Sequence, residues 1–451
     1  MSAEVRYNTP MDIFGTESSQ ARAIARYLAS PIGDEDRCGQ CLGFELEHFI
    51  VEAAASRRVF FEDDPATGKP GVEAILRQLA PLYDEEVYEP QPDGTQRLVG
   101  LARAYINITL EPGAQFEVSI GPCYTITDID LVYRAFRAEI DPLLDAHGYS
   151  LLLVGLDPYT RVVDVPLIPK KRYEYMDRYF EDTGWGGKRM MRGSAATQVS
   201  IDFASEDDAV RKFRIANALC PLLYFIGDNS LVFEDTAVGS GATTYFGVPT
   251  PSRMARSVIW DNTDACRSLT APFTFDEEFC FATYAASLLQ APAVFTYEQD
   301  ATVAGKHATY QGAVPFSKAL GNTPLGTEAI EHVLSLFFYD VRFKTYIEIR
   351  PADALPIEYA LAYTALIKGV FYNEEALEYL AEKFKYLDAA AVAFAKTALR
   401  EHGYTALVYQ RPASEWLDEL ITFARAALLP EELPYLGPLA TLVQERKTLV
   451  G

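Results

Sequence analysis

Apolar and polar residues alternate in several short stretches of this chain, which predicts β-strands. Residues 42–51, 189–203 and 341–350 each show a period of two. Successive side chains of a strand point to opposite faces, so this period is typical of a sheet with one apolar face and one polar face. The pair Pro112-Gly113 marks a turn, which makes residues 104–110 and 115–120 a predicted hairpin.

Other stretches carry the spacing of amphipathic helices. Thr127 is placed to cap a long helix that ends near Gly148, and Ser205 caps another that reaches residue 225. Further helices are expected over residues 17–30 and 71–80. After Pro356 the pattern is almost wholly helical.

The order of these elements indicates an α+β fold with a mainly antiparallel sheet. No repeat, low-complexity tract or clean linker interrupts the 451 residues. We therefore expect one domain over residues 1–451, with the sheet in residues 1–356 and a helical part in residues 357–451. The segment 237–270 is rich in Gly, Ser and Thr and is interpreted as a loop region at the active site.

Polar residues recur in pairs on three of the expected strands. Each pair is separated by one apolar residue, so its two side chains share a strand face while the apolar residue faces the core. Because acidic residues are depleted in strands, their recurrence here is informative. The pairs are Glu45 and Glu47, Gln115 and Glu117, and Glu348 and Arg350.

If these strands lie side by side, four or five carboxylates converge on a small area. Two like charges 4 Å apart repel by about 4 kcal/mol at an effective dielectric constant of 20. Such a face requires either water or cations. An oxygen-only set of ligands suits Mg²⁺ or Mn²⁺ rather than zinc, and we predict a divalent cation; a solvated sheet face is the alternative.

Two arginines are candidates for holding an anionic substrate. Arg192 and Arg256 carry planar guanidinium groups, which grip carboxylates and phosphates with two hydrogen bonds. A surface ion pair is the alternative for either residue. Arg350 differs from both because it shares a strand face with Glu348.

Composition and missing motifs exclude several classes of protein. A net charge of -23 argues against nucleic acid and anionic membranes as partners. No apolar run of 18 residues and no signal-peptide layout occurs, so a cytoplasmic protein is expected. Neither a Walker A motif nor a Gly-x-Ser-x-Gly elbow is found. Cys38 and Cys41 have redox spacing but precede a strand; ordinary cysteines are the main interpretation and a reversible disulfide the alternative.

Taken together in chain order, these motifs resemble the glutamate–cysteine ligases of the plant and proteobacterial type, in the carboxylate–amine ligase group related to glutamine synthetase. The matching stretches are Gly43-x-Glu45-x-Glu47, Thr109-Leu110-Glu111-Pro112-Gly113-x-Gln115-x-Glu117, Pro169-Lys170-x-Arg172-Tyr173, Met190-Met191-Arg192, Thr197-Gln198-Val199, Arg256-Ser257-x-Ile259-Trp260 and Tyr346-Ile347-Glu348-Ile349-Arg350.

The resemblance implies a funnel of antiparallel strands lined by glutamates, with helices outside. It also implies an enzyme that uses ATP and Mg²⁺ (or Mn²⁺) to join the γ-carboxylate of glutamate to the amine of cysteine through a γ-glutamyl phosphate. Metal binding then falls on Glu45, Glu47, Glu111, Glu117 and Glu348. Substrate binding falls on Arg192, Arg256, Gln115, Thr197 and Trp260. Nucleotide binding falls on Arg350 and Gln198, and catalysis on Arg350 and Glu348.

Glutamate, cysteine and ATP are thus the expected small-molecule partners of a monomer or homodimer that starts glutathione or related thiol synthesis. Three alternatives stay open. The chain could join glutamate to a different amine, bind nucleotide or amino acid without catalysis, or bind cations for a structural purpose.

Overall fold

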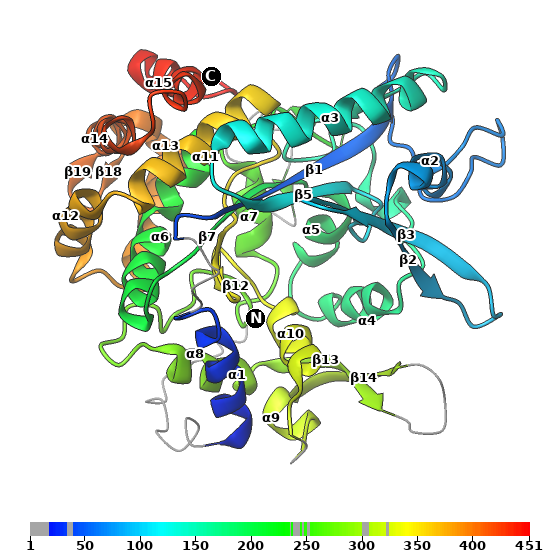
Figure 1. Cartoon of the computed structure of the whole chain (residues 1–451), viewed down its shortest axis with the longest axis horizontal. Coiled ribbons are helices and arrows are strands. Elements are labelled where there is room, and N and C mark those ends of the chain that lie inside the picture. Colours follow the sequence, from blue (N-terminus) through cyan, green and yellow to red (C-terminus); the bar gives the residue numbers. More distant parts are fainter. Residues whose placement is uncertain are drawn as a thin grey trace.

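A nine-stranded antiparallel sheet forms the centre of the computed structural model (Figure 1), which describes residues 18–33, 39–234, 236–237, 244–245, 248–249, 253–299, 306–321 and 324–451. The strand order is β16-β17-β7-β1-β5-β4-β3-β2, and β6 pairs with β1. Each of these pairs is antiparallel. The predicted α+β fold with a mainly antiparallel sheet is therefore confirmed.

The strands of the sheet range from three residues in β16 and β17 to eleven in the central strand β1. They are β1 (Leu42–Glu52), β2 (Glu85–Pro90), β3 (Gln96–Arg103), β4 (Ile106–Leu110), β5 (Phe116–Cys123), β6 (Tyr149–Leu152), β7 (Thr197–Ile201), β16 (Val341–Phe343) and β17 (Ile347–Ile349). Small two-stranded sheets are formed by β8 (Val232–Phe233) with β9 (Thr236–Ala237), β10 (Thr244–Tyr245) with β11 (Val248–Pro249), β12 (Ser268–Leu269) with β15 (Phe338–Tyr339), β13 (Pro292–Gln299) with β14 (Lys306–Pro315), and β18 (Leu407–Val408) with β19 (Arg411–Pro412).

One face of the sheet is apolar and is covered by helices. Phe44 and Leu46 of β1 point to this face, and Phe116 of β5 stacks there against Phe136 of α3 (Ile126–Asp145), with 6.0 Å between ring centroids. In Figure 1, α3 and α11 (Ile357–Phe371) lie along this side of β1 and β5. The alternation in sequence therefore leaves the polar residues of the same strands on the other face.

The described helices other than α3 and α11 also agree with the predicted pattern, although their end residues differ from those predicted. They are α1 (Ser19–Ala29), α2 (Val72–Leu79), α4 (Lys171–Phe180), α5 (Gly187–Gly193), α6 (Glu206–Ile226), α7 (Ala255–Asp261), α8 (Phe281–Gln290), α9 (Phe316–Ala319), α10 (Thr327–Ser335), α12 (Glu374–Phe384), α13 (Ala389–His402), α14 (Ala413–Ala427) and α15 (Leu433–Glu445). Short 3₁₀ helices cover Ala80–Leu82, Val162–Asp164 and Gly403–Thr405. None of the helices in these described ranges combines the length and apolar character that crossing a bilayer requires.

The start of α3 corrects one prediction. The cap is Thr125 and not Thr127, because the Thr125 side chain accepts a hydrogen bond from the backbone N–H of Asp128. The Asp128 carboxylate in turn accepts from the backbone N–H of Thr125 at 3.0 Å. This reciprocal capping box satisfies two N-terminal donors, which Thr127 could not do from inside the helix.

Two predicted strands are wrong in part. The first residues of 189–203 form the end of α5, since Met190 and Met191 are good helix formers and bury themselves on its inner side. Only Thr197–Ile201 is a strand. Likewise residues 341–350 are not one strand but the hairpin of β16 and β17, with a turn over 344–346.

The segment 237–270 is also not loop throughout, because α7 lies within it. Part of that segment falls outside the described residues, as does Cys38, one of the two cysteines with redox spacing. The C-terminal part is helical apart from the β18–β19 hairpin, and α11 packs directly against β7 and β1. In Figure 1 these helices, coloured yellow to red, gather at one end of the sheet.

Candidate functional site

The polar face of the sheet forms a wall of a cavity with a volume of about 230 Å³. Strands β1, β5, β7 and β16 contribute residues to this wall. The rest of the lining comes from α4, α5, α7, α10, β15 and the turns and loops next to these elements. Four glutamates and five cationic side chains line the same space. These residues are Glu45, Glu47, Glu111, Glu117, Arg172, Arg256, Arg342, Lys344 and Arg350.

Strand register explains why these residues meet. Glu47 of β1 lies directly opposite Glu117 of β5, and Glu45 lies directly opposite Gln198 of β7. Opposed residues of antiparallel strands have their Cβ atoms about 5 Å apart, and like charges in that position destabilise a sheet. The predicted convergence of carboxylates from separate strands is present at this site, where Glu111 joins them from the turn after β4.

Burial and mutual repulsion raise the affinity of these carboxylates for protons. Burial, followed by the charges of Glu348 and Glu117, raises the pKa of Glu45 to about 7. Burial and the charges of Glu111 and Glu117 raise the pKa of Glu47 well above its usual range. The pKa of Glu117 is raised too, first by burial and then by Glu111. A cation bound among these carboxylates would favour their charged forms.

Glu47 is oriented by two donors from β7 and the segment before it. One carboxylate oxygen accepts from the backbone N–H of Ala196 at 3.1 Å, and the other accepts from Nε2 of Gln198 at 3.0 Å. The Oε1 of Gln198 accepts from Nη1 of Arg350, which also contacts Glu348 at 2.8 Å. Gln198 and Arg350 thus connect the glutamate cluster to the cationic wall.

Glu348 has a different environment from the other glutamates. Its side chain is fully buried and forms ion pairs with Arg342, Lys344 and Arg350. Burial alone would raise the pKa of Glu348, but these three cations hold it well below the usual range of a glutamate. In this arrangement Glu348 organises the cations of the β16–β17 hairpin.

Sequence reasoning missed Arg342 and Lys344. A signal was present, because both residues alternate with apolar neighbours in the same expected strand as Glu348 and Arg350. The hairpin places Arg342 directly opposite Glu348. Arg172, at the start of α4, gave no comparable signal beyond its place in a matching stretch.

Three buried donors at the cavity have no hydrogen-bond partner among the described residues. They are Nε of Arg172, Nε of Arg256 and Nε1 of Trp260. Arg256 donates from Nη1 to the carbonyl of Pro351 at 3.1 Å, and its guanidinium lies 5.5 Å from the centroid of the Trp260 ring. Buried polar groups are normally satisfied, so these donors indicate a site for an acceptor-rich ligand.

The remaining predicted substrate residues are placed differently. Arg192 pairs with Asp177 and does not line the cavity. Thr197 of β7 lies directly opposite Leu46 of β1, so its side chain points to the apolar face of the sheet, where it is fully buried. Its hydroxyl accepts a hydrogen bond from the backbone N–H of Leu355. The structure does not bring these two side chains to the other predicted residues.

Gln115 lines the cavity but its amide is engaged by the backbone. Its Nε2 donates to the carbonyl oxygens of Met191 at 3.1 Å and Ser194 at 2.9 Å, and its Oε1 accepts from the N–H of Gly113. Gln115 thus joins the β4–β5 turn to the end of α5, which sets the position of the adjoining Glu111.

Comparison with known families identifies the chain's relatives. Residues 41–446 match glutamate–cysteine ligase family 2 (GCS2). The chain belongs to this family. The resemblance read from its motifs is confirmed, and so is the prediction that this member of glutamate–cysteine ligase family 2 is an enzyme.

Curated plant proteins are similar to this family member over most of its length. It is 30% identical over 372 residues to glutamate–cysteine ligase B, chloroplastic, of Oryza sativa subsp. japonica, covering 81% of this chain and 69% of the rice protein. It is also 30% identical over 371 residues to the chloroplastic glutamate–cysteine ligase of Medicago truncatula, covering 81% of this chain and 67% of that protein.

Solved structures are more distant. One is the crystal structure of a glutamate–cysteine ligase from Francisella tularensis in complex with AMP. The match covers 91% of this chain and 82% of the Francisella chain, with a TM-score of 0.48 and 13% sequence identity. The ligase PafA, in its complex with the ubiquitin-like protein Pup, covers 90% of this chain and 63% of its own, with a TM-score of 0.33 and 11% identity.

The donor chemistry of the site fits a hard cation. Glu45, Glu47, Glu111 and Glu117 supply only oxygen ligands, and burial and neighbouring glutamates raise the pKa of three of these carboxylates. As arranged, no three acidic, His or Cys side chains in the described ranges are close enough together to hold one ion. The assignment of metal ligands in this family member stays a prediction.

Proposed function

We propose that this chain uses ATP to join the γ-carboxylate of glutamate to the amine of cysteine, the first step of glutathione or related thiol synthesis. The observation that carries the proposal is the cavity in which four glutamates and five cations face one another. A site for amino acids alone does not need so many charges of both signs. A site that must also hold a triphosphate does, because each phosphate requires cationic or metal partners.

Mg²⁺ or Mn²⁺ would be held by Glu45, Glu47, Glu111 and Glu117. When bound, the ion neutralises phosphate oxygens and helps orient them for transfer. Glu348 is also proposed as a metal ligand, as predicted from the sequence. Its three ion pairs give it a second role, which is to hold the guanidinium of Arg350 where a transferred phosphoryl group would lie.

Glutamate would be held by the cationic wall. Arg256 and Trp260 present buried donors without partners among the described residues, and Arg172 presents a third. Guanidinium groups suit the α-carboxylate and γ-carboxylate because two parallel hydrogen bonds fix the orientation of each. Gln198 contacts both Glu47 and Arg350, so it would join the proposed metal ligands to the cations that face the phosphoryl group. Arg192 and Thr197, although proposed from the sequence, gain no support from their positions.

The proposed reaction has two steps. An oxygen of the glutamate γ-carboxylate attacks the γ-phosphorus of ATP, and the bond to ADP breaks. The amine of cysteine then attacks the γ-carbonyl carbon, and phosphate leaves with the former carboxylate oxygen. Arg342, Lys344 and Arg350 would stabilise the charge on the transferred group, while the departing phosphate can accept the amine proton.

A different amine acceptor is the second candidate, because the cavity lining offers no side chain that marks cysteine specifically. Release of ADP from ATP, Mg²⁺ and glutamate should be measured with cysteine and with a panel of other amines, with products identified by mass spectrometry. We expect cysteine to give the highest kcat/KM. A higher value for another amine would replace cysteine as acceptor, and no ADP release with any amine would support the non-catalytic or structural alternatives.

The cytoplasmic location and the monomeric or dimeric state are retained as predictions from the sequence. The plant relatives carry the word chloroplastic in their names, which describes those proteins.

A further inference from the structure

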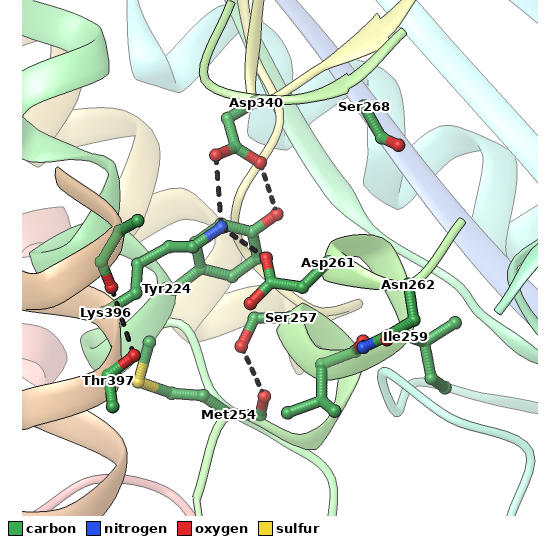
Figure 2. A network of polar contacts seen from close by, with 12 residues as sticks. Tyr224, Met254, Ser257, Ile259, Asp261, Asn262, Ser268, Asp340, Lys396 and Thr397 are labelled. Atoms are coloured by element: carbon green, nitrogen blue, oxygen red, sulfur yellow. Dashed lines mark hydrogen bonds and ion pairs between the residues drawn. The ribbon is translucent and has the colours of Figure 1, made fainter. Parts of the chain in front are cut away.

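A buried ion network (Figure 2) joins α13 of the C-terminal part to α7 and to the residue before β16. Both α7 and the β16–β17 hairpin contribute residues to the cavity lining. The centre of the network is Lys396 of α13, whose side chain is only 4% exposed. The Nζ atom lies 2.8 Å from Oδ1 of Asp261 and 3.4 Å from Oδ2 of Asp340. The hydroxyl of Tyr224 on α6 donates to the other oxygen of Asp340 at 2.7 Å.

Arg400, one turn further along α13, strengthens the same connection. Its guanidinium pairs with the second carboxylate oxygen of Asp261. Its Nε and Nη2 also donate to Oγ of Ser257, at 3.0 and 2.7 Å. Ser257 in turn donates to the carbonyl of Met254 at 2.6 Å, as Figure 2 shows. Two cations of one helix therefore hold both ends of α7.

The first anchored element, α7, carries substrate-binding candidates. Asp261 is its last residue, while Arg256 and Trp260 of the same helix line the cavity. The helix has only seven residues, so its own hydrogen bonds cannot fix its position. Lys396 and Arg400 supply external contacts that do.

The second anchored element is the β16–β17 hairpin. Asp340 immediately precedes β16, and its backbone carbonyl accepts from the N–H of Arg350 at 3.1 Å. The next residue but one is Arg342, which pairs with Glu348. A shift of Asp340 would therefore move the cations that face the proposed phosphoryl group.

The contacts of Lys396 divide between both elements, and this distinguishes it from an ordinary buried ion pair. One ammonium group bridges an aspartate of α7 and an aspartate of the hairpin, so it sets the separation between the glutamate side and the phosphate side of the cavity. Buried networks in a low dielectric are strongly directional, because an unpaired member is costly.

We propose that Lys396, aided by Arg400, is a positioning residue for catalysis: it lies outside the cavity and holds Arg256 and Arg350 at the separation the reaction requires. This inference rests on the proposed function, since it assigns the two walls to glutamate and to the phosphoryl group. It gives the helical C-terminal part a task in the reaction besides packing.

Steady-state kinetics of Lys396→Met tests the proposal. We expect kcat to fall about 100-fold, since a misplacement of about 1 Å can cost that much, together with a higher KM for glutamate. Lys396→Arg keeps the charge and should recover most of the loss. Arg400→Gln loosens α7 alone, so the KM for glutamate should rise while kcat changes much less.

Lys368→Met is the matched control. Lys368 of α11 forms a buried ion pair with Glu432 at 2.7 Å in the same helical part, and its ammonium group also donates to the carbonyl of Tyr124. These partners lie outside α7 and the hairpin. Loss of Lys368 should lower the melting temperature and leave kcat and both KM values of the folded protein unchanged. If Lys396→Met behaves like Lys368→Met, the positioning role is contradicted.

The same variants also decide two further cases. If Lys396→Met does not fold, the split between KM and kcat in Arg400→Gln decides, and unchanged values there overturn the proposal. If the wild-type chain forms no product, the proposed function fails. Hydrogen exchange over residues 255–261 and 341–349 then tests positioning alone, and it must increase more in Lys396→Met than in Lys368→Met.

Discussion

At the scale of single residues, the unusual feature is a set of buried carboxylates facing one another. Glu47 and Glu117 occupy directly opposed positions of β1 and β5, where like charges are unfavourable. Burial raises the pKa of both carboxyl groups, and the charge of Glu111 raises it further. A bound divalent cation would reverse both effects, so affinity for such a cation is the property these residues should confer.

Glu47→Gln should therefore weaken Mn²⁺ binding and slow the reaction, each by about 100-fold or more, since a lost metal interaction is worth several kcal/mol. Electron paramagnetic resonance of Mn²⁺ measures the first effect without reference to activity. Glu52→Gln, at the end of the same strand where it pairs with Lys69, is the control and should bind Mn²⁺ normally. Equal Mn²⁺ affinity in the two variants would remove Glu47 from the proposed metal ligands.

Arg256 supports a second prediction at this scale. Arg256→Ala should raise the KM for glutamate by about 10- to 100-fold, because a hydrogen bond to a charged group contributes about 1.5–3 kcal/mol. The KM for ATP should change much less. Arg214→Ala removes another arginine that donates to a backbone carbonyl, that of Thr274, and should leave both values unchanged. An equal rise in both KM values would contradict the glutamate assignment.

At the scale of elements, alternation predicted the strands that carry the glutamates, because β1 and β5 have long regular patterns. It failed where a short segment changes conformation. Alternation predicts a strand over residues 189–193, yet the apolar residues of this segment can also form one side of a short helix. Only packing against the rest of the protein decides between strand and helix. The hairpin at 341–350 was missed because its turn over 344–346 contains neither Gly nor Pro.

Contacts that depend on how particular elements pack or pair could not be predicted from the sequence. The sequence predicts that Arg192 binds substrate, because nothing in it indicates the ion pair with Asp177. That pair depends on how α4 and α5 pack. Thr197 was assigned from its motif, although its register beside Leu46 turns it to the apolar face. The roles of Lys396 and Arg400 depend on residues more than 50 positions away in the chain.

Arg58 illustrates how one side chain fixes several elements. It is buried, donates to the carbonyl of Gly113 at 2.5 Å and to that of Arg192, and pairs with Asp157 at 3.4 Å. Arg58→Met should reduce the free energy of unfolding by about 3–5 kcal/mol, since Asp157 is left buried without its cation. Urea unfolding measures this loss. Arg161→Met removes a solvent-exposed pair with Asp164 and should shift the midpoint far less. A similar shift in both variants would contradict this role of Arg58.

At the scale of the whole molecule, charge is distributed unevenly. The chain carries a net charge of -23, yet five cations line one cavity. Anionic substrates are repelled by the molecule at a distance and must be held by local contacts. The proposed function therefore requires that the fixed guanidinium groups of the cavity, together with any bound cations, hold the substrates.

A pH dependence of stability follows from a second acidic pair. Burial, and next the charge of Asp353, raises the pKa of Asp228 well above its usual range. A carboxyl group of this kind stabilises the fold below its unfolded pKa near 3.9, and that contribution is lost as the pH rises through the folded value. The side chain introduced by Asp228→Asn cannot ionise. The melting temperature of this variant should therefore increase relative to that of the wild type as the pH rises from 5 to 9. A constant or shrinking difference would contradict this assignment.

The central claim is that the charged cavity activates the γ-carboxylate of glutamate by phosphorylation. Glutamate labelled with ¹⁸O in that carboxylate, incubated with ATP, Mg²⁺ and cysteine, tests it most directly through ³¹P NMR of the released phosphate. We predict one ¹⁸O atom in phosphate for each γ-glutamylcysteine formed. Product formation with unlabelled phosphate would contradict the acyl-phosphate route, and ATP hydrolysis without product would contradict the ligase itself.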